Sequence, residues 1–221
     1  MKRYVSLEEI SDGRLYTAKD MVRADCHGCE GCSACCHGMG ESIILDPYDV
    51  YRLEKMEGFS FAESIGRTIE LNVVDGVILP NLMMSGEKES CGFLDQEGRC
   101  SIHPYRPGIC RLFPLGRFYE EGSFRYFLQK DECPKARTKI KLSKWLDTPE
   151  LSRYEEFVLH WHYLVKDLEE KVSGGDVEES KKWNMSLLKL FYCSPYDSSQ
   201  DFFAQYENRC QLFQENPVQA C

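Results

Sequence analysis

The sequence contains no long hydrophobic run and no excess of positive charge. No stretch approaches the ~20 apolar residues that a membrane-spanning helix needs, and the N-terminus lacks the apolar core of ~7–15 residues typical of a secretory signal. Lys and Arg total 27 against 36 Asp and Glu, so the formal net charge is −9. An acidic chain is poorly suited to nucleic acids and anionic membranes. We therefore expect a cytoplasmic protein with no nucleic-acid partner and no membrane partner.

Cysteine, in contrast, is abundant and unevenly distributed. The chain has 12 cysteines in 221 residues, and five of them lie between Cys26 and Cys36. An even number is compatible with disulfides, but the content is below the ~8–10% typical of small disulfide scaffolds. In the reducing cytoplasm, clustered thiols indicate metal binding or catalysis. The sequence therefore favours a metal site over a disulfide framework.

The spacing within the first cluster supports metal binding. Residues 29–36 read CEGCSACC, and Cys26 adds one more Cys-x2-Cys step in front of them. Two intervening residues allow both thiolates to reach one metal ion, as in zinc and iron–sulfur sites. The side chains of the adjacent pair Cys35 and Cys36 diverge in an extended chain. This pair is therefore expected to serve different metals or different corners of a polynuclear cluster.

A second group of cysteines starts at Cys91, and 54 residues lie between it and Cys36. Together the two groups make eight candidate ligands, with Cys26 as an additional one: Cys29, Cys32, Cys35, Cys36, Cys91, Cys100, Cys110 and Cys133. Eight thiolates suit two four-ligand sites. Either the fold brings the two groups together or each group forms its own site.

Charged and imidazole side chains accompany the thiols. Arg106 and Arg111 flank Cys110 and are predicted to bind the cofactor by offsetting thiolate charge, the alternative being surface ion pairs with carboxylates. His27, His37 and His103 are possible further ligands, and the sequence leaves their role open. The remaining histidines, His160 and His162, and the isolated cysteines, Cys193, Cys210 and Cys221, are expected to serve packing or to be incidental.

Hydropathy and turn signals predict an α+β fold, with a cysteine-rich metal-binding domain over residues 1–137 and a helical segment over 138–221 packed on it. The expected elements of the first part are a short helix at 6–10, a strand at 43–45, a helix that starts after the Asp46 cap and ends at Gly58, a helix capped by Ser60, hairpins at 69–84 and 91–100, and a strand at 124–129.

The second part is expected to be helical from Thr138 onward. Its first long helix has apolar residues at helical spacing from Tyr154 to Leu168, which indicates a core or docking face. The sequence SGGD at 173–176 should end this helix, and two further helices are predicted at 178–192 and 198–213. A protein partner could bind through these helices, and the oligomeric state is not predicted.

The cysteine motifs resemble a known family. CEGCSACC, then CGFLDQEGRCSIHPYRPGICRLFP, then Cys133 are similar in order and spacing to the CxxCxxCC family of zinc- or iron-chelating domains, also called YkgJ-family cysteine cluster proteins. The resemblance covers about residues 25–135. It implies that the eight cysteines from Cys29 to Cys133 are the chelators and that Arg106, Pro107 and Arg111 form the signature around Cys110. His103 stands near a position that is usually aromatic.

Three classes of function are compatible with these features. The first is an iron–sulfur protein, with a 4Fe-4S cluster expected, in a redox or substrate-binding role. The second is a zinc-stabilised module that binds a protein partner. The third is a metal-dependent enzyme, by analogy with the flagellin lysine N-methylases that share the cysteine motif. That analogy is weak, because the sequence has neither a Cys-x3-Cys-x2-Cys motif nor a Gly-x-Gly-x2-Gly turn, so enzymatic activity is left undecided.

Overall fold

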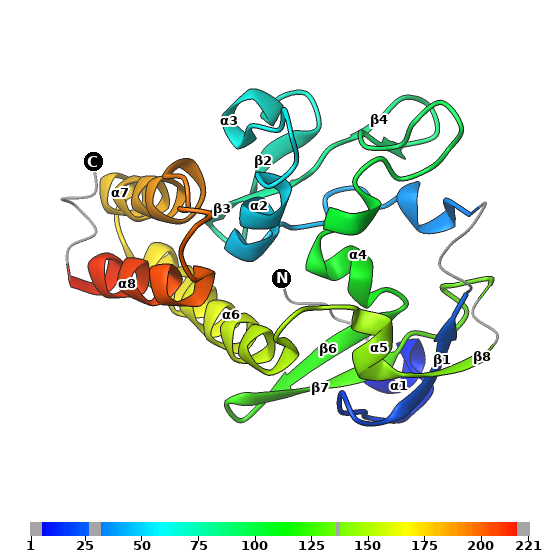
Figure 1. The fold of residues 1–221 in the computed structure, drawn as a ribbon. Coiled ribbons are helices and arrows are strands. Elements are labelled where there is room, and N and C mark those ends of the chain that lie inside the picture. Colours follow the sequence, from blue (N-terminus) through cyan, green and yellow to red (C-terminus); the bar gives the residue numbers. More distant parts are fainter. Residues whose placement is uncertain (1–5, 27–31, 136–137, 216–221) are drawn as a thin grey trace.

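The computed structural model describes residues 6–26, 32–135 and 138–215, and helices alternate in it with short antiparallel strand pairs (Figure 1). The α+β prediction is thereby confirmed. The elements up to Leu112 are α1 (Leu7–Ile10), β1 (Met21–Asp25), the 3-10 turn η2 (Ala34–Cys36), α2 (Pro47–Leu53), α3 (Phe61–Ser64), β2 (Ile69–Val74), β3 (Val77–Leu82), β4 (Met84–Ser85), β5 (Ser90–Cys91), the 3-10 turn η3 (His103–Tyr105) and α4 (Gly108–Leu112).

The second half of the chain starts with strands and ends with helices. Its elements are β6 (Leu115–Glu120), β7 (Ser123–Leu128), β8 (Thr138–Lys141), α5 (Leu142–Leu146), α6 (Leu151–Gly174), α7 (Val177–Leu188), the π-helical turn η4 (Lys189–Cys193) and α8 (Phe202–Glu215). Within the described residues, no helix combines the length and hydrophobicity required to cross a membrane.

Local sequence signals account for several of these elements. Helix α2 begins as predicted, because Asp46 and Asp49 form a reciprocal capping box and Pro47 occupies the first turn. The hairpin of β2 and β3 turns at Asp75 and Gly76, which both have positive φ, as a type I′ turn requires. Ser6 caps α1 and Ser60 caps α3 by accepting a backbone hydrogen bond. The short helix near 6–10, the starts of α2 and α3 and the hairpin turn are confirmed, whereas α2 ends at Leu53 and not at the predicted Gly58.

The predicted strand at 43–45 was wrong, and the predicted 91–100 hairpin is shorter than expected. Residues 43–45 form a single bridge, Ile44 to Asn81, and no strand; Leu45 donates to the Pro80 carbonyl, but proline has no N–H with which to continue the ladder. Cys91 pairs with Met84 of β4 and not with the residues around Cys100. The expected 91–100 ribbon is limited to the bridge between Leu94 and Cys100 and the flanking backbone bonds from Asp95 N to Arg99 O and from Ser101 N to Phe93 O.

The strands β1, β6 and β8 were not predicted. β6 pairs with β7 through a turn at Glu121 and Gly122, both with positive φ, and this Glu-Gly pair was the available sequence signal. β8 pairs with β1, with Val22 opposite Ile140, so Thr138–Lys141 is a strand in the region that was expected to be helical. This pairing joins the two ends of the cysteine-rich region, because the cysteines from Cys26 to Cys133 lie between β1 and β8 in the sequence.

The C-terminal helices share one hydrophobic core with α2 and the β2–β3 hairpin (Figure 1). The apolar face predicted for α6 is buried there; its fully buried members are Tyr154, Phe157, Val158, Trp161, Leu168 and Val172. Polar contacts fasten the same interface, since Tyr192 donates to the Leu45 carbonyl at 2.9 Å and the Asn184 side-chain oxygen accepts from Ile78 N at 2.6 Å. This face of α6 is therefore core. A second core cluster lies among β1, β6, β7 and α5.

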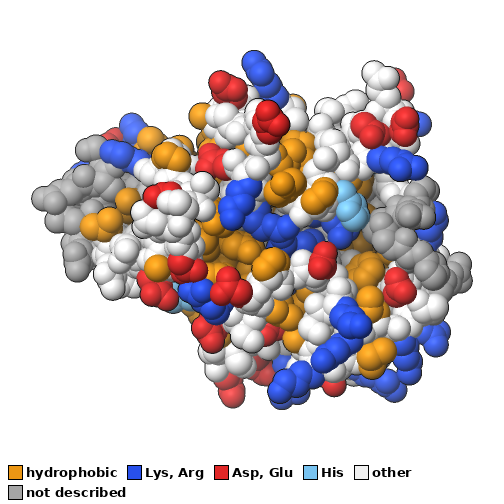
Figure 2. Space-filling model, in the orientation of Figure 1, with side chains coloured by type: hydrophobic (Ala, Val, Ile, Leu, Met, Phe, Trp, Pro, Cys, Tyr) orange, Lys and Arg blue, Asp and Glu red, His pale blue; other side chains and the backbone are white. Residues whose placement is uncertain are grey.

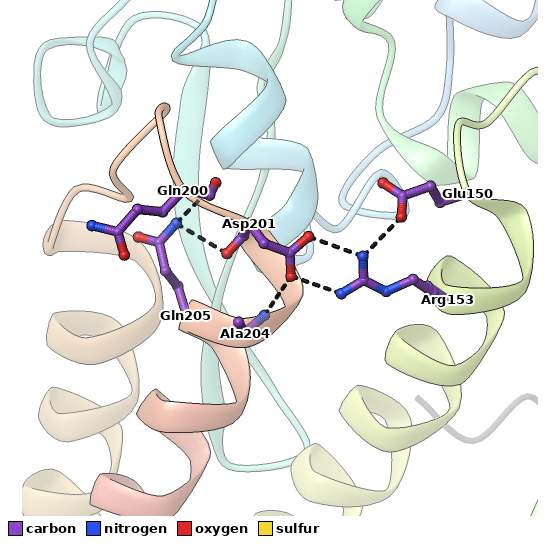
Figure 3. A network of polar contacts seen from close by, with 6 residues as sticks. All are labelled: Glu150, Arg153, Gln200, Asp201, Ala204 and Gln205. Carbon is purple, nitrogen blue, oxygen red and sulfur yellow. Dashed lines mark hydrogen bonds and ion pairs between the residues drawn. The ribbon is translucent and has the colours of Figure 1, made fainter.

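The start of α6 is joined to the start of α8 by a surface network (Figure 3). Arg153 donates to both oxygens of Asp201, at 2.9 and 2.7 Å, and to Glu150 at 2.8 Å. Asp201 also accepts from the backbone N of Ala204, which caps α8. The network sets the relative position of the two helices at the end nearest α2.

Candidate metal centre

The two cysteine groups, distant in sequence, meet in space. A cavity of about 1180 Å³ is lined by thiols from three segments: Cys32, Cys35 and Cys36, then Cys91 and Cys100, then Cys110 of α4. A second, small cavity of about 30 Å³ is lined by Cys26, Cys32, Cys35, Cys110 and Cys133. Cys32, Cys35 and Cys110 line both cavities. Of the two arrangements that the sequence left open, the fold adopts the one that brings the groups together.

The segment after Cys36 is fastened to β5, which carries Cys91. Gly38 N donates to the Glu89 carbonyl at 3.0 Å, and His37 forms a bridge with Ser90. The two ring nitrogens of His37 lie 3.0 Å from the Ser90 hydroxyl and 3.4 Å from the Ser33 hydroxyl. Through these two serine contacts His37 positions the cysteine segment. His27 and Cys29 lie outside the described residues.

Helix α4, which carries Cys110, is positioned by a buried carboxylate. Asp49 is 1% exposed, and its Oδ1 accepts a hydrogen bond from Gly108 N at 2.7 Å. Tyr154 of α6 packs directly against Gly108, where a Cβ would overlap its hydroxyl group. Asp49 and Tyr154 were not predicted as parts of the site, since Asp49 suggested only a helix cap and Tyr154 only a core residue.

The thiols influence one another electrostatically. A hydrogen bond from the Cys36 thiol lowers the pKa of Cys35 to about 7, and the same contact raises the pKa of Cys36. Burial raises the pKa of Cys110 well above its ordinary value, and negative charge on Cys91 and Cys35 raises it further. A set of thiols that disfavour one another's ionisation is stabilised by a bound cation, which favours the thiolate forms.

The two predicted arginines take different positions. Arg106 lines both cavities, and its charge adds to the Cys36 hydrogen bond in lowering the pKa of Cys35. Arg111 is 4% exposed and lies beside the carboxylates, where its charge opposes the rise that burial causes in the pKa of Asp49. Its guanidinium is also 5.6 Å from the ring of Tyr154. Arg106 is thus the arginine next to the thiols.

Positively charged side chains gather at the surface near this region. Figure 2 shows Lys and Arg side chains across the middle of one face, between α2 and α4, with hydrophobic side chains on both sides of them. His103 is largely exposed and lines the larger cavity, and partial desolvation of its ring lowers its pKa. A non-thiolate ligand from His103 stays a prediction.

Cysteines and histidines of the C-terminal helices lie apart from the thiol cavities. Cys193 is exposed, and Cys210 is buried with its sulfur 4.0 Å from Nδ1 of His160. Nδ1 of His160 is 2.8 Å from the Tyr206 hydroxyl, while His162 stacks on Tyr119 with the ring centroids 3.7 Å apart. Among the residues the structure describes, no three His, Cys, Asp or Glu side chains are close enough together to hold a metal ion as they stand.

The donor set nevertheless fits a thiophilic metal. The larger cavity brings six cysteines from three segments of the chain together, and these six are free thiols. The Nε of Arg106 is buried and has no hydrogen-bond partner among the described residues, so it is available to a negatively charged group. Thiolates are the ligands preferred by zinc and by iron–sulfur clusters.

Comparisons with known proteins agree with this donor set. Searches of curated proteins and of solved structures gave no match. A family model described as "CxxCxxCC: Putative zinc- or iron-chelating domain" matches residues 28–138, which is half of the chain and covers both cysteine groups from Cys29 to Cys133. The chain therefore belongs to the CxxCxxCC family of zinc- or iron-chelating domains.

Proposed function

We propose that this protein holds one or two iron–sulfur clusters, of the 4Fe-4S type, on cysteine thiolates and uses them in a redox or substrate-binding role. The observation that carries the proposal is the convergence of six thiols on one cavity and five on another, with three shared. Iron–sulfur clusters are held by four thiolates each, so a set of eight ligands suits two such clusters. The proposed ligands are Cys29, Cys32, Cys35, Cys36, Cys91, Cys100, Cys110 and Cys133, with Cys26 as a possible ninth.

The predominance of sulfur in the donor set supports a thiophilic metal site, zinc or iron–sulfur, over a site for hard cations. Hard cations such as Mg²⁺ and Ca²⁺ require oxygen ligands, whereas these cavities converge on sulfur. The thiols of the adjacent pair Cys35 and Cys36 contact each other in the 3-10 turn η2 and do not diverge as expected for an extended chain, and one thiol is more acidic than the other. Such a pair suits two corners of a cluster better than a single tetrahedral ion.

The chain's own residues have definable parts in this function. Arg106 supplies positive charge beside the thiolates, which lowers the cost of gathering negative sulfurs. His37 and Asp49 fix the segments that carry Cys35, Cys36 and Cys110. A bound cluster would supply electron transfer or an open coordination position. A cytoplasmic location is part of the proposal, because a reducing compartment keeps these thiols free to bind metal.

The test is iron, zinc and acid-labile sulfide per chain in anaerobically purified protein. We expect roughly four iron with four sulfide, or a multiple of these amounts. Replacing Cys35, Cys91 or Cys110 by serine should lower iron and sulfide together, whereas the matched control Cys193→Ser should retain them, since Cys193 is exposed on η4 and does not line either cavity. Zinc without sulfide would refute the iron–sulfur proposal.

A zinc-stabilised module is the second candidate. It is favoured by the way the thiols connect segments that are far apart in the chain, because a structural metal contributes folding energy where it joins such segments. The proposed protein partner would bind exposed residues of the C-terminal helices, since their apolar faces are buried against α2 and β3. A colourless protein with stoichiometric zinc would establish this candidate.

A further inference from the structure

The larger cavity extends beyond the thiols into a region with different chemistry. There it is lined by Arg117 and Tyr119 of β6 and by Trp161, His162 and Val165 of α6. None of these residues belongs to the cysteine motifs, and β6 was not predicted as an element. At about 1180 Å³, the cavity exceeds the ~300–1,000 Å³ typical of small-molecule sites, so it has room for an organic ligand beside the thiols.

Arg117 and Lys166 are the cationic residues that line this region, and the Arg117 guanidinium is incompletely bonded. Its Nε is buried and has no hydrogen-bond partner in the described part of the chain. Its Nη2 makes one long contact, 3.4 Å, with the Tyr154 hydroxyl. The Tyr119 side chain is a further hydrogen-bond partner, and the guanidinium carbon is 5.8 Å from the ring centre of Phe124 and 5.7 Å from that of Tyr154.

No carboxylate of the described residues forms an ion pair with Arg117. Asp46 and Asp49 also line the cavity, and three of their four carboxylate oxygens accept backbone hydrogen bonds. Asp46 Oδ1 accepts from Asp49 N at 2.8 Å, and the two oxygens of Asp49 accept from Gly108 N and Asp46 N at 2.7 and 3.2 Å. The charge of Arg117 opposes the rise that burial causes in the pKa of Asp46 and Asp49, but its buried Nε keeps a hydrogen-bond donor available for a bound anion.

The walls around Arg117 suit an apolar or aromatic body. Trp161 is buried and faces the cavity, and Val158 and Val165 line it from the same helix. The ring of His162 stacks on Tyr119 with an interplanar angle of 7°, so a flat aromatic surface stands beside the guanidinium. The ends of the cavity therefore differ in chemistry, with thiols at one end and a cation among rings at the other.

We infer that this cavity binds a small organic anion, with a carboxylate or phosphate group against Arg117 and an apolar body along Trp161 and Val165. A guanidinium donates two parallel hydrogen bonds to either acidic group, so the two groups share one recognition chemistry. The position of the ligand next to a metal rests on the proposed function. Binding of the anion to Arg117 does not rest on it.

The test is calorimetric titration of the full-length, metal-loaded protein with phenylacetate, phenyl phosphate and the neutral phenylacetamide, up to about 10 mM, the range expected for fragment-sized ligands. At least one anion should bind about tenfold or more tightly than the amide, as expected for a charge-assisted hydrogen bond. Comparison of the two anions identifies the preferred acidic group. Failure of both anions to bind, or equal binding of the amide, would overturn the inference.

Two variants locate the binding site. Arg117→Gln should weaken anion binding by about tenfold or more. Its matched control, Arg125→Gln, removes an exposed arginine of the partner strand β7, opposite Phe118, and should leave affinity unchanged. Val165→Phe should weaken all probes by filling the cavity, and it gives an answer even if Arg117→Gln does not fold. Affinities unchanged in both Arg117→Gln and Val165→Phe would place binding elsewhere and overturn the inference.

Metal analysis of the same samples separates the two proposals. If the protein has no iron or zinc but the anions still bind in an Arg117-dependent way, only the proposed function fails. If the metal content is as expected but no anion binds, only the present inference fails. Repeating the titration after removal of the metal shows whether the metal contributes to affinity.

Discussion

The carboxylate of Asp49 in α2 accepts a hydrogen bond from the backbone nitrogen of Gly108, 2.7 Å away, at the first residue of α4. This bond connects residues that are 59 positions apart in the sequence. Because α4 carries Cys110, the position of that thiol depends on Asp49, a residue that is far from every cysteine in the sequence. Asp49 is therefore a positioning residue for the proposed metal site.

Replacing Asp49 by alanine should reduce both stability and metal content. The substitution leaves the buried Gly108 N–H without an acceptor, which costs about 1–3 kcal/mol. Asp49→Asn keeps an acceptor oxygen and should lose less. The measurements are urea unfolding and metal analysis of the purified variants.

The control for this prediction is Asp176→Ala. Asp176 caps α7 by accepting from Glu179 N at 2.8 Å and is exposed, so its loss should cost about 1 kcal/mol without affecting metal content. If Asp49→Ala bound metal as the wild type does, the positioning role would be wrong.

Gly108 should not tolerate a side chain. A Cβ at this position would overlap the Tyr154 hydroxyl, so Gly108→Ala is expected to destabilise the protein by about 1–3 kcal/mol. Removing the hydroxyl should restore part of the loss, so the double variant Gly108→Ala with Tyr154→Phe should be more stable than Gly108→Ala alone. A double-mutant cycle in denaturant measures the coupling, and strict additivity would contradict the contact.

Stability should fall as the pH decreases from about 6.5 towards 4, in part because of His162. Burial lowers the pKa of His162 to about 4 from its ordinary value of 6.5, and the charge of Lys166 contributes. Between these values the unfolded chain binds the proton and the folded protein does not. The free energy of unfolding therefore declines with falling pH, by at most about 1.4 kcal/mol per pH unit for one proton.

The pH effect of His162 is isolated by comparing the wild type with His162→Gln. Urea unfolding of both proteins at pH 7, 6, 5 and 4 gives two stability curves. The stability of the wild type relative to His162→Gln should fall with decreasing pH, because glutamine does not take up a proton. A constant difference across this range would show that His162 does not titrate as described.

Removal of the metal should lower the melting temperature. A metal that joins the segments of Cys35, Cys91 and Cys110 stabilises the folded state only, and for a chain of this size each kcal/mol corresponds to about 2–4 °C. Chelation should thus destabilise the wild type and Cys193→Ser equally. It should have a smaller effect on Cys110→Ser, and equal effects on all three would exclude a structural contribution from Cys110.

Short-range signals predicted the elements whose determinants lie within a few residues. The Asp46–Asp49 capping box and Pro47 define the start of α2, and Asp75-Gly76 defines the β2–β3 turn. The apolar residues of α6 from Tyr154 onward recur at helical spacing and are buried as expected. The set of candidate thiols could also be read from spacing, although their role as ligands stays a prediction.

The pairing of β1 with β8 and the separate environments of Arg106 and Arg111 could not be predicted in this way. Val22 lies opposite Ile140, and no local pattern encodes a partner at that separation. Arg106 and Arg111 look equivalent around Cys110 in the sequence, yet Arg111 points towards the Asp49 environment and Arg106 lines the thiol cavities. Helix direction and packing against Tyr154 make this difference.

The sequence by itself therefore determined the fold class, the capped helices, the main hairpin and the family with its cysteine motifs. Only the tertiary structure decided which thiols share a cavity, which residues hold α4 in place and where Arg117 lies. The physical reason is that capping, turn geometry and hydrophobic periodicity act over a few residues, whereas a cavity is formed by side chains that packing brings together from distant segments.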